Sequence, residues 1–247
     1  MGVAIKNSVA LVTGANRGIG RAISEGLLEA GAVKVYAAVR NLASVDELIE
    51  RYGDRVIPIE FDLTRPETAV AAAEIATDVN LVVSNAGVLN VSDPLAEDAV
   101  KSLQFQMEGN VYPLIRLAQA FGPVLKANGG GTLAQMNSLA SLKNFTPFTT
   151  YSASKAAAYS VTQGLREAWA EQGTQVISIL AGPLKTDMSD SAGMGDGAPS
   201  PDLVADALIG ALESGDFLVY PDAMAQGAGE AYASFADNVI NAKSSEE

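Results

Sequence analysis

The chain has 247 residues, of which 48% are hydrophobic and 18% are charged, a profile typical of a folded globular domain rather than of a disordered or fibrous chain. Its formal net charge of −13 argues against a broad basic surface for nucleic acid or an anionic membrane, although arginines can still form one local anion pocket. The absence of histidine and cysteine excludes Ser-His-Asp triads, thiolate chemistry and most zinc sites, so we expect no metal centre.

Seven short apolar runs alternate with longer segments whose apolar residues recur at helical spacing. The predicted strands are 8–14, 33–40, 55–61, 79–87, 131–138, 174–182 and 216–222. The predicted helices are 18–31, 44–53, 65–77, 95–128, 150–173, 200–215 and 226–242. Because strands that alternate with helices form βαβ units, this order predicts an α/β fold whose parallel sheet is covered by helices on both faces.

The chain shows no fixed-period repeat and no linker that would divide it into two cores. We therefore expect a single domain over residues 1–247. Residues 189–201 carry glycines and prolines that disfavour a regular element, and they follow a strand end. We expect a substrate flap near 184–200 rather than an ordinary surface loop, and a C-terminal helix with a polar tail over 224–247.

The first predicted strand ends at Thr13 and is followed by Gly14, Gly18 and Gly20 before a helix begins. Glycines let the backbone approach a pyrophosphate closely, and the helix N-terminus adds free N–H groups and the positive end of its dipole. This turn therefore predicts an anion cradle. Its spacing differs from the usual GxGxxG, and no GK[ST] follows, which disfavours a P-loop NTPase.

Tyr151 and Lys155 lie four residues apart in a predicted helix, so their side chains project from the same face. A phenol with the ordinary pKa of about 10 is a poor proton relay near neutral pH. A cation at roughly 6 Å and an effective dielectric of about 20 would favour the phenolate by about 2.8 kcal/mol, or about two pKa units. The pair by itself is compatible with acid–base chemistry and also, as is commoner for side chains at this spacing, with a packed tyrosine and a solvated lysine.

Six segments together resemble the short-chain dehydrogenase/reductase family, in that family's order along the chain. They are TGANRGIG at 13–20, SNAG at 84–87, Asn110 in GNVYP, Ser138 in MNSLAS, YSASK at 151–155 and AGPLKTDM at 181–188. The resemblance covers nearly the whole chain and implies a doubly wound Rossmann fold with a seven-stranded parallel sheet in the order 3-2-1-4-5-6-7. Ser84, Pro113 and Ala181 depart from the family pattern, and Pro113 leaves open whether the helix bends to expose the Asn110 carbonyl.

For catalysis, the resemblance implies that Tyr151 donates a proton to a carbonyl oxygen and that Lys155 holds the nicotinamide ribose. Ser138 would orient the carbonyl oxygen by a hydrogen bond, and Asn110 would bind a water that passes protons between Lys155 and solvent. The expected cofactor-binding residues are Gly14, Asn16, Arg17, Gly18, Ile19, Gly20, Arg40, Asn41, Asp62, Leu63, Asn85, Ala86, Gly87, Tyr151, Lys155, Gly182, Leu184 and Thr186.

The second predicted strand ends at Arg40, where an acidic residue would bind the adenosine ribose hydroxyls. An arginine instead favours a 2′-phosphate, and Arg17 could supply a second cation. We therefore expect NADP(H) in preference to NAD(H). The alternative is that both arginines are simply solvated. The resemblance also implies that Asp62 meets the adenine amino group.

These observations predict an NADPH-dependent oxidoreductase that reduces ketones or aldehydes to alcohols. Two alternatives stay open: a 3-oxoacyl-carrier-protein reductase, for which an acidic chain is a poor match to an acidic carrier, and a nucleotide-binding sensor without turnover. We expect a small-molecule substrate, no nucleic-acid or membrane partner and a cytoplasmic location, with a homodimer or homotetramer as the family implies. The expected substrate pocket is mainly apolar and includes Leu89, Val91, Leu139, Phe145, Phe148 and Met194.

Overall fold

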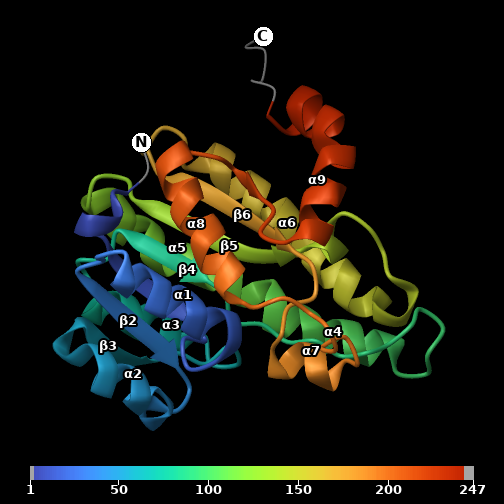
Figure 1. The fold of residues 1–247 in the computed structure, drawn as a ribbon, viewed down its shortest axis with the longest axis horizontal. Helices are drawn as coiled ribbons and strands as arrows, with labels where there is room; N and C mark the ends of the chain where they lie inside the picture. The colour runs from blue at the N-terminus through green and yellow to red at the C-terminus, as the bar shows by residue number, and fades with distance from the viewer. Residues whose placement is uncertain (1–2, 242–247) are drawn as a thin grey trace.

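A computed structural model describes residues 3–241, which contain a seven-stranded sheet (Figure 1). The strands are β1 (Val9–Thr13), β2 (Lys34–Val39), β3 (Val56–Glu60), β4 (Leu81–Ser84), β5 (Thr132–Ser138), β6 (Gln175–Ala181) and β7 (Leu218–Val219). All neighbouring strands are parallel, and their order is β3-β2-β1-β4-β5-β6-β7. The predicted Rossmann fold and its strand order are confirmed.

Alternate residues of each strand face opposite sides of the sheet and enter two separate cores. Ala10 and Val12 of β1 belong to a core shared with α1 (Gly18–Glu29), α2 (Asp46–Tyr52) and α8 (Asp202–Ser214). Leu11 belongs to the core on the other face, which is shared with α3 (Glu67–Ile75), α5 (Tyr112–Ala127) and α6 (Thr149–Ala168). Because helices cover both faces, the strands are near-continuous apolar runs, which makes them easy to recognise in the sequence.

The segment predicted as one helix, 95–128, forms two helices. α4 (Ala99–Asn110) ends where Val111 adopts φ −112° and ψ −56°, and α5 then begins at Tyr112. Pro113 explains the break, because it has no N–H to donate to the carbonyl of Gly109 and its ring crowds that carbonyl. A proline is well tolerated in the first turn of a new helix. The break leaves Asn110 as the last residue of α4.

Other boundaries differ from the prediction in detail. The expected flap contains a short helix, α7 (Asp187–Ser191), because Thr186 and Ser189 form a reciprocal capping box that supports it. The C-terminal helix is α9 (Ala223–Phe235), followed by a π-helical turn at Ala236–Ile240, and the predicted tail at 242–247 lies outside the described residues. Short 3₁₀ turns occur at Ile5–Asn7, Leu42–Val45, Gly53–Arg55, Leu139–Ser141 and Thr146–Phe148.

The chain changes direction across the sheet at β1. From β1 it continues outward through β2 to β3, and it then returns to β4 on the other side of β1. In open α/β sheets, such a switch point leaves a crevice outside the carboxyl ends of the strands, where ligands bind. The fold therefore places the expected site at the ends of β1, β4 and their neighbours.

Candidate active site

A cleft of about 890 Å³ lies along this carboxyl edge and is lined mainly by residues at and after the ends of β1 to β6, with Met224 of α9. Every residue predicted to bind the cofactor or to take part in catalysis lines this cleft, with the exception of Gly20. The segments that supply them are far apart in the sequence, so the sheet brings them together. Their individual roles stay predictions.

The turn between β1 and α1 folds back tightly on itself. Gly14 and Gly18 have φ angles of +69° and +52°, in the left-handed region that favours glycine. A Cβ at Gly20 would lie 2.2 Å from the carbonyl oxygen of Gly14, so only glycine fits there. The N-cap residue of α1, Arg17, makes no side-chain cap, which leaves the first N–H groups of α1 for an anion.

Thr13, which the sequence analysis did not single out as a site residue, ties the glycine turn to the loop after β4. Its hydroxyl donates to the carbonyl of Val83 at 3.3 Å and accepts the N–H groups of Asn85 at 2.9 Å and Ala86 at 3.0 Å. The Asn85 amide in turn donates to the Thr13 carbonyl at 2.8 Å. The signal available in the sequence was a polar residue at the last position of a buried strand.

The end of β2 leads to Arg40, which is exposed and lines the cleft. Within residues 3–241 it takes part in no salt bridge, whereas Arg17 pairs with Asp187 at 2.8 Å. Asp62 accepts the N–H of Thr64 at 2.9 Å and its hydroxyl at 2.8 Å. These bonds, the backbone one first, hold the pKa of Asp62 below its ordinary value, and the nearby Arg40 adds to the effect.

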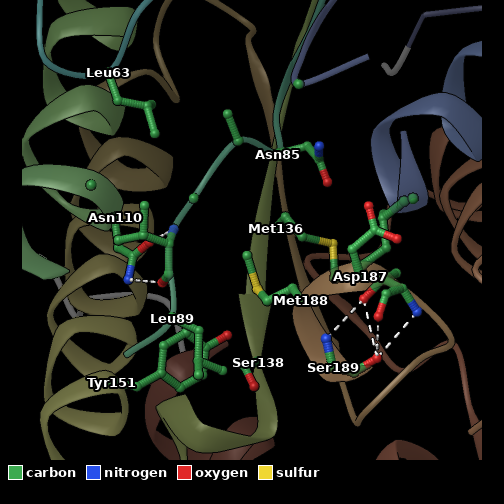
Figure 2. A pocket seen from close by; sticks show the side chains of 18 of the residues that line it. Leu63, Asn85, Leu89, Asn110, Met136, Ser138, Tyr151, Asp187, Met188 and Ser189 are labelled. Carbon is green, nitrogen blue, oxygen red and sulfur yellow. Dashed lines mark hydrogen bonds between the residues drawn. The ribbon is translucent and has the colours of Figure 1, made fainter. Parts of the chain in front are cut away.

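Ser138, Tyr151 and Lys155 meet at the other end of the cleft, where β5 ends beside α6. The ammonium of Lys155 donates to the carbonyl of Met136 at 2.8 Å and lies 5.8 Å from the centre of the Tyr151 ring. Figure 2 shows Tyr151 and Ser138 in the same part of the cleft. The Ser138 hydroxyl accepts the N–H of Ala140 at 3.2 Å, which holds it at the cleft wall.

Burial sets the acidity of the tyrosine and the lysine. It raises the pKa of Tyr151 to about 12, opposed by a hydrogen bond with Ser138, and it lowers the pKa of Lys155 to about 8. The direction for Tyr151 is opposite to the one expected from a neighbouring cation. The physical reason is that removing the phenolate from water costs more than the hydrogen bond with Ser138 returns. Tyr151 is therefore protonated at neutral pH. The pKa of Lys155, about 8, is close to neutral pH.

The side chain of Asn110 is fully engaged in hydrogen bonds with the protein. Its oxygen accepts the N–H of Val88 at 2.8 Å, and its amide donates to the Val88 carbonyl and to the Ser154 hydroxyl, both at 2.9 Å. Its backbone carbonyl lies at the break between α4 and α5, and its expected role in binding a water stays a prediction. With proline at position 113, the helix thus still breaks after Asn110.

The wall beside Tyr151 is mainly apolar. Of the side chains expected there, Leu89, Leu139, Phe145, Phe148 and Met194 line the cleft, while Val91 does not and is 51% exposed. The sequence analysis did not name Phe105, Met136, Met188 or Met224, although Met188 falls within the expected flap. With Met194, four methionines of residues 3–241 line the cleft. Figure 2 shows Met136 and Met188 projecting into it. Isolated methionines carry no sequence signal that separates a pocket wall from a core.

Comparison with known proteins agrees with this geometry. The family model for short chain dehydrogenases matches residues 8–196, which is most of the chain. The chain belongs to the short-chain dehydrogenase family. It is thus an oxidoreductase of that family.

Relatives of this short-chain dehydrogenase match most of its length. An uncharacterized oxidoreductase of Staphylococcus saprophyticus is 30% identical over 220 residues, 85% of this chain and 93% of the relative. A short chain dehydrogenase from Burkholderia cenocepacia, solved in complex with NADP, is 35% identical with a TM-score of 0.87, covering 97% of this chain and 98% of that one. A family member from Burkholderia phymatum, solved with NAD, is 18% identical with a TM-score of 0.82 over 98% and 97% of the two chains, a likeness of fold alone.

Proposed function

We propose that this protein is an NADPH-dependent oxidoreductase that reduces uncharged ketones or aldehydes with apolar substituents. The observation that carries the proposal is the convergence of Ser138, Tyr151 and Lys155 in one cleft with the glycine turn and Arg40. The first group of residues can orient and protonate a carbonyl oxygen. The second can hold a phosphorylated dinucleotide at the opposite end of the same cleft.

The residues present fit NADP(H). The close approach of Gly20 to Gly14 and the uncapped start of α1 form a cradle for a pyrophosphate. Arg40 would hold the 2′-phosphate, since it is exposed and is free of any salt bridge to residues 3–241. The NADP complex of the 35% identical relative supports this choice. The reduced nicotinamide, when bound, supplies the hydride that the carbonyl carbon accepts.

Tyr151 supplies the proton. With a pKa raised to about 12 by burial, its phenol is protonated at neutral pH, and an alkoxide is basic enough to take that proton. Ser138 orients the carbonyl oxygen toward the phenol by a hydrogen bond. Lys155, with a pKa lowered to about 8, can release and regain a proton near neutral pH, so it can restore the phenol through water at the Asn110 carbonyl.

The charges along the cleft indicate which substrates fit. Among residues 3–241, the basic side chains that line it are those of Arg17, Arg40 and Lys155, and the two arginines lie at the glycine turn and the end of β2. The lining side chains next to Tyr151 are mostly aliphatic, aromatic or thioether, and the acidic Glu108 of α4, which also lines the cleft, lies 3.7 Å from Arg116. The described residues that line this end would offer no guanidinium to a carboxylate or phosphate on the substrate. We therefore propose neutral substrates with bulky apolar groups.

The remaining expectations stay predictions. A homodimer or homotetramer is the family expectation, and a cytoplasmic location is a prediction from the sequence. The helices within residues 3–241 include none with the length and apolar character needed to cross a bilayer. Reduction of a 3-oxoacyl carrier protein is the alternative to be tested, and so is cofactor binding without turnover.

A carbonyl screen with NADPH and NADH side by side tests the proposal. Neutral aryl and alkyl ketones and aldehydes, 2-keto acids and an acetoacetyl-carrier protein serve as substrates, with loss of NADPH absorbance as the readout. We expect turnover of neutral ketones with NADPH and little with keto acids. Fast turnover of the carrier-bound substrate alone would support the carrier-protein alternative. NADPH binding without its oxidation by any substrate would support the sensor alternative.

A further inference from the structure

A buried polar stripe lies where α4 packs against α6. Ser102, Gln106 and Asn110 follow one another at intervals of four residues on α4, and Thr150 and Ser154 do so on α6. All five side chains are at most 4% exposed. Buried polar groups cost stability unless they are hydrogen-bonded, so the bonds between these residues define how the two helices fit.

Gln106 repeats the hydrogen bonds of Asn110 one helical turn earlier. The Asn110 amide accepts the N–H of Val88 and donates to its carbonyl, at 2.8 and 2.9 Å. The Gln106 amide likewise accepts the N–H of Asn90 and donates to its carbonyl, both at 3.3 Å. Two amides on one helix face thus hold residues 88 and 90 of the loop after β4.

Both amides also reach α6. Asn110 donates to the Ser154 hydroxyl at 2.9 Å, and Gln106 donates to the Thr150 hydroxyl at 2.6 Å. Ser102 completes the network, since its hydroxyl lies 2.9 Å from that of Thr150 and accepts the Asn90 amide at 2.9 Å. Gln106 and Asn110 therefore each form a hydrogen-bonded bridge that joins α4, the loop after β4 and α6. On α6, the two bridges end at Thr150, before Tyr151, and at Ser154, after it.

The bridge through Gln106 leads to two residues of the cleft. Thr150 directly precedes Tyr151, and Asn90 directly follows Leu89, which lines the substrate side. Gln106 itself is 0% exposed and does not line the cleft, so its connection to the site runs through these neighbours. Figure 2 shows Leu89 and Tyr151 at the same end of the cleft as Asn110.

We propose that Gln106 is a positioning residue for the reduction, which sets the place of the Tyr151 phenol through Thr150 and that of Leu89 through Asn90. The inference rests on the proposed function of Tyr151 as proton donor. A displacement of about 1 Å at a reacting group costs up to 100-fold in rate, so loss of the bridge slows catalysis while the cofactor end of the cleft is untouched.

The test compares four variants. Gln106→Met keeps the length of the side chain and removes the amide, Thr150→Val removes the hydroxyl, and Thr150→Ser restores it. Thr132→Val is the matched control, because Thr132 is fully buried and donates to Gln175 at 3.2 Å, but lies at the start of β5, away from Ser138. Each variant is measured for melting temperature, NADPH Kd by fluorescence, kcat with a neutral ketone and the solvent isotope effect on kcat.

We expect Gln106→Met and Thr150→Val to lower kcat about tenfold or more with the NADPH Kd within about twofold of the parent. Their solvent isotope effect should rise, because proton transfer from a displaced phenol becomes slower. Thr150→Ser should return close to the parent, and Thr132→Val should lose melting temperature with kcat unchanged. A kcat and a solvent isotope effect at parental values in Gln106→Met and Thr150→Val would overturn the inference. If Gln106→Met does not fold, the comparison of Thr150→Val with Thr150→Ser decides it.

A second readout is independent of turnover. In protein labelled with [¹³Cζ]tyrosine, the Tyr151 resonance is assigned by its loss in Tyr151→Phe, and its pKa is followed by titration. Because a displaced phenol changes its distance from Ser138, we expect the Tyr151 pKa to shift in Gln106→Met and Thr150→Val but not in Thr132→Val. An unchanged resonance and pKa would overturn the inference even if no substrate were turned over, a result that would count separately against the proposed function.

Discussion

Arg17 and Asp187 join the glycine turn to the flap: Nη1 of the arginine lies 2.8 Å from Oδ2 of the aspartate. Next to this pair, Thr186 packs on Gly18: a Cβ at position 18 would lie 3.2 Å from the methyl group of Thr186. The two charged side chains are 69% and 70% exposed, so water and salt screen the pair, and exposed pairs contribute at most about 1 kcal/mol. Arg17 is therefore held weakly and can be drawn to a stronger anion.

Replacing Asp187 by asparagine should strengthen NADPH binding. The change frees Arg17 for the proposed 2′-phosphate, and a contribution below about 1 kcal/mol corresponds to a gain of about two- to fivefold in affinity. NADH, which lacks that phosphate, should bind as before. Fluorescence titration with both cofactors at low salt measures the effect. The control is Asp190→Asn, because Asp190 lies in the same short helix as Asp187 but pairs with Lys185 instead of Arg17. Equal changes for NADPH and NADH would contradict the prediction.

Replacing Tyr151 by phenylalanine should abolish the proton donor without disturbing the cleft. General acid catalysis contributes about 10²- to 10⁴-fold, so kcat for ketone reduction should fall by that factor while the NADPH Kd stays within about twofold. Tyr159→Phe is the matched control, because Tyr159 is a buried tyrosine two turns later on α6 and does not line the cleft. Turnover retained in Tyr151→Phe would exclude the phenol as the acid.

Replacing Arg40 by aspartate should shift the cofactor preference toward NADH. The carboxylate repels a 2′-phosphate and can accept hydrogen bonds from ribose hydroxyls instead. The ratio of kcat/KM with NADPH to kcat/KM with NADH should fall by about 100-fold or more, which corresponds to roughly 3 kcal/mol for replacing attraction by repulsion. Arg51→Asp, at an exposed arginine of α2 that does not line the cleft, controls for the change in net charge. An unchanged ratio in Arg40→Asp would reject the phosphate assignment.

The pH dependence of reduction should report Lys155. Its pKa is lowered to about 8 by burial, so the ammonium is present below pH 8 and is lost as the pH rises through that value. Tyr151, with a pKa raised to about 12, stays protonated throughout this range. We therefore expect kcat/KM for reduction to be level below pH 8 and to fall above it. Lys155→Met should lower kcat/KM and remove this pH limb, and the same limb in Lys155→Met would assign it to another group.

Two glycine-to-alanine changes should have opposite effects on stability. At Gly20 the new methyl group would meet the carbonyl oxygen of Gly14 at 2.2 Å, so the turn must shift and both unfolding free energy and NADPH affinity should fall. Gly164 lies in α6 with open space around its Cβ position, so Gly164→Ala should stabilise the protein by about 0.5–1 kcal/mol. Chemical denaturation measures both values, and a stabilised Gly20→Ala would show that the cradle is loose.

Much of the fold and the cleft could be predicted from the sequence. The strands are buried on both faces, so each appears as an apolar run, and the parallel order follows from their alternation with helices. Ser138 was expected from the resemblance to the family, whereas the glycine turn and the Tyr151–Lys155 pair have spacings that local geometry sets. These are features that one strand end or one helix face determines by itself.

What escaped prediction depends on contacts between elements. Pro113 is compatible with a helix start as well as with a helix break, so 95–128 looked continuous. Gln106 and Thr150 are polar residues at helical spacing, which suggests a solvated face until α4 is packed against α6. The pKa of Tyr151 depends on burial, which its distance from Lys155 along the helix does not reveal.

The thioether side chains around the cleft have a consequence for oxidative stress. Met188 and Met224 are 41% and 59% exposed, within reach of peroxide, and oxidation converts each apolar side chain to a polar, chiral sulfoxide. Such a change would make the substrate side of the cleft more polar. The Tyr151 phenol, the Lys155 ammonium and the glycine turn would stay chemically intact. A chain without cysteine is thereby still open to redox damage, of a kind that methionine sulfoxide reductases can repair.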